Sequence, residues 1–233
     1  MLIAAGVFLL ACLVGYDFTL KAEYEKGAYK SRFYGMTEIK IKDFDKIKHK
    51  CGNMIGLRVE QGKTYGVWMQ SFQKDWIKFS QQGETLNIDY VGKEEESWGS
   101  SVGIIIICPK ISQVDATTYM PKLPGVRFSL RGLVEVAGFK QTVPLSISAG
   151  AWTDFYLTNN KLTQLNADFG FSSGDEPNLT IDNNNIIHAA NLNLKGNSTL
   201  NLYSPAIAQP NYHFGDSTRV TLSGSSLKLV QPK

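Results

Sequence analysis

From residue 37 onward, apolar and polar residues alternate with a period of two and not with the 3.6-residue period of a helix. The clearest alternating runs are Ile55–Val59, Val67–Met69 and Leu86–Tyr90, and glycine-containing turns separate them. Side chains of a strand point to opposite faces in turn, so this pattern is typical of half-buried β-strands. We therefore predict an all-β domain over residues 37–233.

One run in the first part of this domain, residues 37–115, has a different composition. Val102–Cys108 is almost continuously apolar and ends at Pro109. A strand that is buried on both faces has such a composition, and proline, which cannot donate to the sheet, is typical of a strand end. We predict a fully buried strand here.

The second part of the domain, residues 116–233, contains a repeat that glycines introduce. Pairs of apolar residues that flank one other residue follow Gly150, Gly174, Gly196 and Gly215. These pairs are Phe155/Leu157, Leu179/Ile181, Leu200/Leu202 and Val220/Leu222. A second set lies between them and consists of Leu165/Ala167, Leu192/Leu194 and Leu227/Leu229.

Short apolar pairs that recur about every 20 residues are typical of a β-solenoid, in which equivalent side chains stack inward from one coil to the next. Glycine and asparagine tolerate the left-handed backbone of tight corners, and Asn159-Asn160 and Asn183–Asn185 fit such corners. We predict solenoid coils over residues 116–233. An ordinary β-sandwich with irregular loops is the alternative.

The amino terminus is an unbroken apolar run, Leu2–Val14, and the first charged residue is Asp17. A helix over residues 2–16 would be about 22 Å long, against about 30 Å for a bilayer core. We predict a hydrophobic helix over residues 1–16 that acts as a signal peptide or membrane anchor, followed by a polar tether over residues 17–36. A buried core element is the alternative.

The same run gives a second indication of export. Leu9–Cys12 resembles the lipid-attachment box of bacterial lipoproteins, so Cys12 is a candidate lipidation site. Export to the cell envelope, as a periplasmic or surface protein tethered to the membrane, follows from this interpretation. The excess of basic residues over Lys21–Lys50 points the other way, because such an excess is typical of a cytoplasmic flank.

The order of the strand motifs resembles the order found in a known protein family. It begins with Phe44-x-x-Ile47 and Leu57-x-Val59-x-x-Gly62, and its most specific parts are Gly83–Ile88, Leu130–Val136 and Arg219–Gly224. Over about residues 37–230 the chain resembles the putative auto-transporter adhesin, head GIN domain family of Gram-negative envelope proteins. The resemblance implies a single-stranded, right-handed β-helix of short parallel strands, exported and attached to the envelope, with no catalytic residues to carry over.

Composition and motifs exclude several kinds of chemistry. The net charge is +3, from 24 Lys and Arg against 21 Asp and Glu, which is too weak a balance to predict nucleic-acid binding. His49, His188 and His213 lie in unrelated segments without a cysteine at ligand spacing, so we expect surface or corner histidines and no metal site. The sequence contains no nucleophile elbow, phosphate loop or dinucleotide fingerprint, and we expect no cofactor.

Cys51 and Cys108 leave two alternatives open. They are either buried as small apolar residues or joined in a disulfide, which export would permit. The sequence does not fix the oligomeric state either.

An enzymatic role would need carboxylates aligned on one face of the coils. Asp154, Asp168 and Asp182 are 14 residues apart, which does not match a coil of about 20 residues, so we expect them to form turns. We therefore predict a non-enzymatic protein that binds glycans or other proteins through a polar flank, with Trp98 and Trp152 as candidate contact residues. A polysaccharide lyase or glycosidase is the alternative, and a tethered sensor that contacts an envelope protein is a third hypothesis.

Overall fold

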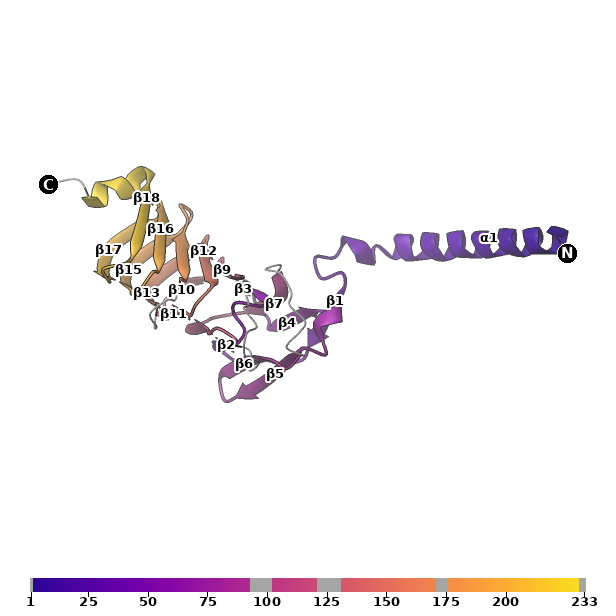
Figure 1. Cartoon of the computed structure of the whole chain (residues 1–233), viewed down its shortest axis with the longest axis horizontal. Coiled ribbons are helices and arrows are strands. Elements are labelled where there is room, and N and C mark those ends of the chain that lie inside the picture. The colour runs from indigo at the N-terminus through magenta and orange to yellow at the C-terminus, as the bar shows by residue number, and fades with distance from the viewer. Residues whose placement is uncertain (1, 93–101, 121–130, 171–175, 231–233) are drawn as a thin grey trace. The chain divides into compact units, whose positions relative to one another are not determined.

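The structure, a computed structural model, describes residues 2–92, 102–120, 131–170 and 176–230 (Figure 1). The chain divides into two compact units, residues 1–37 and 38–233. The first unit contains α1 (Leu2–Lys26) and the short helix η1 (Ala28–Lys30). Ala5–Lys26 is long and apolar enough to cross a membrane, with a mean hydropathy of 1.5. Because α1 continues to Lys26, the backbone does not change at residue 16, and only the polarity of the side chains does.

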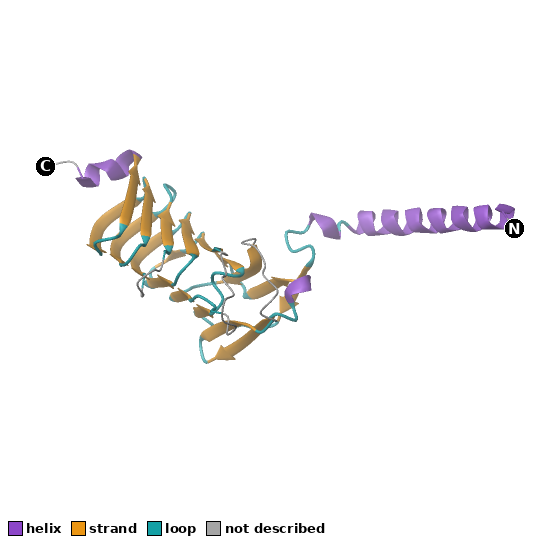
Figure 2. Ribbon diagram, in the orientation of Figure 1, coloured by secondary structure: helices purple, strands orange, loops and turns teal. Residues whose placement is uncertain are grey.

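The second unit is built from two sheets (Figure 2). The first sheet contains, in spatial order, β1 (Met36–Ile39), β4 (Gly66–Gln70), β7 (Val102–Cys108), β3 (Gly56–Gln61), β9 (Gly132–Ala137), β12 (Thr153–Thr158), β14 (Asn178–Ile181), β16 (Thr199–Tyr203) and β18 (Arg219–Ser223). The second contains β17 (Ala206–Phe214), β15 (Ile186–Leu194), β13 (Lys161–Phe169), β11 (Leu145–Ala149), β8 (Gln113–Ala116), β2 (Lys46–His49), β6 (Thr85–Tyr90) and β5 (Ile77–Gln82), with β10 (Lys140–Gln141) beside β13. The prediction of a mostly β chain with one N-terminal helix is confirmed.

Successive strands from β11 to β18 alternate between the two sheets, and within each sheet they pair in parallel. The first set of apolar pairs lies in register across β12, β14, β16 and β18: Phe155 pairs with Leu179, Leu179 with Leu200, and Leu200 with Val220. Phe155, Leu179 and Leu200 are fully buried. The stacking predicted for these pairs is thus confirmed.

The second set of pairs is shifted by two residues. Leu165 pairs with Ala190, and Phe169 with Leu194, and each of these two strands buries four apolar residues and not two. The prediction for Leu227/Leu229 is wrong, because both lie in the short helix η3 (Gly224–Val230). A shift by two residues keeps every side chain on its face, so spacing in the sequence could not fix this register.

The prediction that Val102–Cys108 is buried on both faces is also wrong. Ile104 and Ile106 are fully buried, whereas Ile105 and Ile107 on the opposite face are only half-buried. Ile105 lies in register between Trp68 of β4 and Arg58 of β3. The apolar residues on this outer face are therefore partly covered by the side chains of neighbouring strands, and they do not form a second core.

The structure tests the expectations for the two cysteines Cys51 and Cys108 and for His49. Cys51 and Cys108 are free and buried, as the first alternative has it. His49 is not a surface residue but is fully buried, with Nε2 2.7 Å from the carbonyl oxygen of Ile55 and Nδ1 3.6 Å from Cys51 Sγ. Burial lowers the pKa of His49 to about 4, only partly offset by the hydrogen bond to Ile55.

Candidate functional site

The outward side of the second sheet carries two straight rows of polar side chains across five neighbouring strands, which we name the polar face. The rows follow from the parallel register, which places every second residue of each strand on the same side as its neighbours. The first row is Gln113, Ser146, Asn166, Asn191 and Asn211. The second row is Asp115, Ser148, Asp168, Asn193 and His213.

The first row forms a ladder of side-chain amides. Asn211 Nδ2 donates to Asn191 Oδ1 at 3.3 Å, and Asn191 Nδ2 donates to Asn166 Oδ1 at 3.0 Å. Gln164 Nε2 also donates to Asn166 Oδ1, at 3.1 Å. Each amide is thereby held in one orientation, so the row presents its remaining donors and acceptors at the strand spacing of about 4.8 Å.

The second row contains two carboxylates, and both accept hydrogen bonds from neighbours in the sheet. Asp115 accepts from Ser148 Oγ at 2.7 Å and from Gln113 Nε2 at 2.6 Å. Asp168 accepts from Asn193 Nδ2 at 2.8 Å. Between the rows lies a shallow depression of about 360 Å³. This arrangement supplies fixed hydrogen-bond partners to a ligand that lies flat on the sheet.

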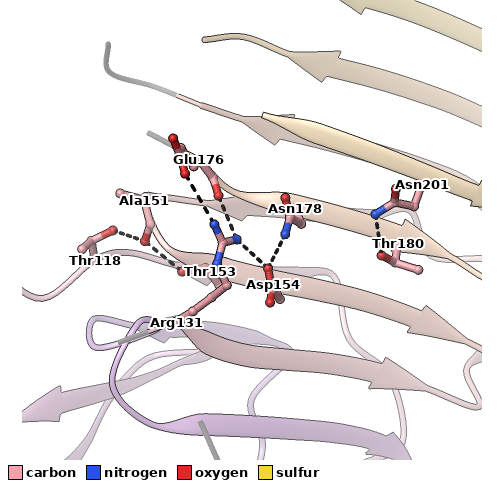
Figure 3. A network of polar contacts seen from close by, with 9 residues as sticks. All are labelled: Thr118, Arg131, Ala151, Thr153, Asp154, Glu176, Asn178, Thr180 and Asn201. Atoms are coloured by element: carbon pink, nitrogen blue, oxygen red, sulfur yellow. Dashed lines mark hydrogen bonds and ion pairs between the residues drawn. The ribbon is translucent and has the colours of Figure 1, made fainter. Parts of the chain in front are cut away.

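The outward side of the first sheet carries a different kind of network (Figure 3). Arg131 Nη1 lies 2.7 Å from Asp154 Oδ1, which also accepts from Asn178 Nδ2 at 2.6 Å. Arg131 Nη1 donates to the carbonyl oxygen of Glu176 at 3.0 Å, and further along the sheet Asn201 Nδ2 donates to Thr180 Oγ1 at 3.2 Å. Because these groups satisfy one another across three strands, we interpret the network as a clamp that holds strands together.

Replacing Arg131 with alanine should lower the free energy of unfolding by about 1 kcal/mol, since the ion pair is half-exposed and solvent screens it. Urea unfolding at low and high salt measures this. The difference between Arg131→Ala and wild type should shrink at high salt. A loss that is the same at both salt concentrations would mean that the hydrogen bond to Glu176, and not the ion pair, carries the effect.

The three aspartates of the enzymatic alternative do not meet. Asp182 forms a turn, as predicted, because its Oδ1 accepts from the backbone N–H of Asn184 at 3.0 Å. The same prediction is wrong for Asp154 and Asp168, which lie within β12 and β13 on different sheets. Among the described residues, no group of three or more His, Cys, Asp or Glu is placed to hold a metal ion.

The other candidate residues from the sequence are the contact residues Trp98 and Trp152 and the lipidation site Cys12. Trp152 precedes β12 in a left-handed conformation (φ 53°) and is half-buried. Cys12 is exposed on α1. Trp98 lies outside the described residues. Trp152 therefore precedes a strand of the first sheet, whereas the polar face lies on the second sheet.

Asp168 and His213 are named above for other reasons, but the polar face as a set of residues was not predicted, although its signal is present in the sequence. Asn166-x-Asp168, Asn191-x-Asn193 and Asn211-x-His213 repeat one polar pattern on three strands. Their spacing follows the same coils as the apolar pairs, because each of these polar residues alternates with a core residue of its strand.

Comparison with known proteins identifies no family. No family model and no curated protein matches the chain. Among solved structures, a protein called a putative adhesin from Bacteroides fragilis is similar with a TM-score of 0.41 and 11% identity, covering 80% of this chain and 94% of that one.

Two solved structures from Parabacteroides distasonis are more distant. One, called a putative adhesin, has a TM-score of 0.34 and 14% identity over 81% of this chain and 96% of that one. The other, called a putative lipid binding protein, has a TM-score of 0.29 and 13% identity over the same shares. Likenesses at this level do not identify a function for this chain.

Proposed function

We propose that residues 37–233 form a right-handed, single-stranded β-helix of the head GIN type, whose coils each contribute a strand to both sheets. The alternation of strands between the sheets and their parallel, in-register pairing support this architecture. A stack of short parallel strands is rigid along its length, because each coil packs on the next. Such a body holds surface side chains at fixed spacing without a dedicated pocket.

We propose that this protein is a non-enzymatic, membrane-tethered binding module of the bacterial envelope, an adhesin or scaffold that contacts extended polar ligands, glycans above all, through the polar face. The observation that carries the proposal is the pair of polar rows in register across β8, β11, β13, β15 and β17, in which hydrogen bonds hold several neighbouring side chains together. A polymer with regularly spaced hydroxyl groups would meet one amide or hydroxyl partner per strand. Many weak contacts then add to a useful affinity.

The tether is part of the same proposal. Residues 1–16 would serve as signal peptide or anchor and residues 17–36 as the polar tether, with Cys12 as the lipidation site if the segment is processed as a lipoprotein. The apolar stretch Ala5–Lys26 supports an attachment to the membrane. Trp98 and Trp152 remain proposed as additional stacking contacts.

Binding to a glycan array tests the function directly. Wild-type protein should bind one or more extended glycans, and Asn191→Arg should weaken that binding at least tenfold, about 1.4 kcal/mol, by placing a long side chain across the amide ladder. Asn201→Arg is the matched control, because Asn201 also donates one ladder hydrogen bond but lies on the other sheet. It should leave the binding within about twofold of wild type.

Two results would overturn the proposal. If Asn201→Arg weakens binding as much as Asn191→Arg, the polar face is not the contact surface. If new reducing or unsaturated ends form on the bound glycans in the presence of wild-type protein, the chain is a carbohydrate-active enzyme.

A further inference from the structure

The strands that carry the polar face also form a second surface feature at their amino-terminal ends. A groove of about 920 Å³ runs across the first residues of β13, β15 and β17, next to β10. We name it the apolar groove. On each of the three strands its outward residues lie at least two positions before the polar face begins, so the two sites share strands but not side chains.

The chemistry of the groove changes along its length. One row of outward residues runs in register from Lys140 to Lys161, Ile186 and Ala206, so two cations are followed by two apolar side chains. Ile186 is 54% exposed, which is unusual for an isoleucine at the start of a strand that is paired on both sides. Val143, also in the lining, adds to the apolar surface.

Neither of the two lysines forms an ion pair with another residue of the part of the chain that the structure describes. They lie opposite one another on adjacent strands, about 4.8 Å apart at their Cα atoms, and both are exposed. No carboxylate of the described residues lies within 4.0 Å of either amine. Like charges directly opposite one another destabilise a sheet, so a bound anion between them would be favourable.

We propose that the apolar groove binds a long-chain fatty carboxylate, with its carboxylate between Lys140 and Lys161 and its hydrocarbon chain along Ile186 towards Ala206. Charge complementarity fixes the head group at one end, and the apolar lining accounts for the tail. An acyl chain suits this lining better than a sugar, because the described residues that line the groove include no Phe, Tyr or Trp, and the imidazole of His188 is the one aromatic ring among them that a sugar could stack on. The site is independent of the polar face and of its glycan ligand.

Titration of the full-length protein with palmitate at pH 8, followed by calorimetry, tests the proposal. Lys140→Glu/Lys161→Glu should weaken palmitate binding at least tenfold, whereas Lys228→Glu, an exposed lysine on η3, should leave it within twofold. Helix α1 is present in all variants, so palmitate that binds to its apolar surface cancels in the comparison.

A second pair of variants tests the tail. Ile186→Ser should weaken palmitate binding several-fold, and Val91→Ser is the matched control because Val91 is also 54% exposed. The proposal is overturned if palmitate does not bind. It is also overturned if the lysine variant binds palmitate as wild type does, or if the cationic amphiphile cetyltrimethylammonium binds as tightly as palmitate. Failure of glycan binding by Asn191→Arg would leave this site unaffected.

Discussion

Asn160→Ala is expected to lower the free energy of unfolding by about 4 kcal/mol, because the side chain satisfies buried backbone groups at a corner between coils. Asn160 is 1% exposed. Its Oδ1 accepts from the backbone N–H of Phe139 at 2.9 Å, and its Nδ2 donates to the carbonyl oxygen of Val136 at 3.0 Å. Phe139 and Val136 are themselves fully buried, so alanine would leave a donor and an acceptor without a partner or water.

The same residue connects two coils. Asn160 Nδ2 also donates to Oδ1 of Asn185, which is fully buried, and Asn185 Nδ2 donates to the carbonyl oxygen of Leu157 at 2.7 Å. The two asparagines therefore form an internal ladder, one coil above the other. Removing the lower rung withdraws a hydrogen bond from the upper one, which adds to the cost of the substitution.

Urea denaturation followed by circular dichroism measures the effect. Asn211→Ala is the control, since Asn211 also belongs to an asparagine ladder but is exposed, and its loss should be below about 0.5 kcal/mol. Equal, small losses for both variants would contradict the internal ladder. If Asn160→Ala does not fold in buffer alone, wild type, Asn160→Ala and Asn211→Ala are compared in sucrose, an excluded osmolyte that stabilises all three folded states.

The strands and their stacking could be predicted from the sequence because their strongest determinants are local. An apolar pair such as Leu200/Leu202, preceded by a glycine, reports both the strand and its buried face. Corner asparagines are recognisable for the same reason: Asn159 has a φ of 54°, which asparagine tolerates better than most residues. The prediction of parallel stacking needed only the recurrence of these two signals.

The candidate site and the burial of His49 depend on register, which local signals leave open. Asn191 could be recognised as a ladder residue only once β15 was known to lie between β13 and β17. His49 follows Ile47 at a spacing of two and so shares its buried face. A histidine at that position does not reveal that the carbonyl oxygen of Ile55 accepts a hydrogen bond from its ring. These contacts join segments that are separated in the sequence, and no local pattern indicates that they lie side by side.

The second large effect is expected from pH, through His49. Its pKa is lowered to about 4 by burial, against 6.5 in an unfolded chain. The unfolded state therefore binds a proton more readily below pH 6.5. Stability is complete above that pH and falls as the pH drops from 6.5 to 4. The difference of about 2.5 pKa units corresponds to about 3 kcal/mol.

The contacts of the ring explain why the neutral form is preferred. Nε2–H donates to the carbonyl oxygen of Ile55, which leaves Nδ1 as an acceptor that faces the thiol of Cys51. Burial raises the pKa of Cys51 far above its usual value, so the thiol remains protonated and can donate to Nδ1. A proton on Nδ1 would place two donors against each other in a site without water-exposed surface.

Unfolding of wild type and His49→Gln by urea at pH 7 and pH 4 isolates this contribution, because carboxylates that titrate near pH 4 affect both proteins alike. Glutamine retains a donor for Ile55 but cannot be protonated. The loss of stability between the two pH values should be about 3 kcal/mol larger for wild type than for His49→Gln. If both proteins lose the same amount, His49 does not titrate between these pH values in a buried site, and its placement in the core is wrong.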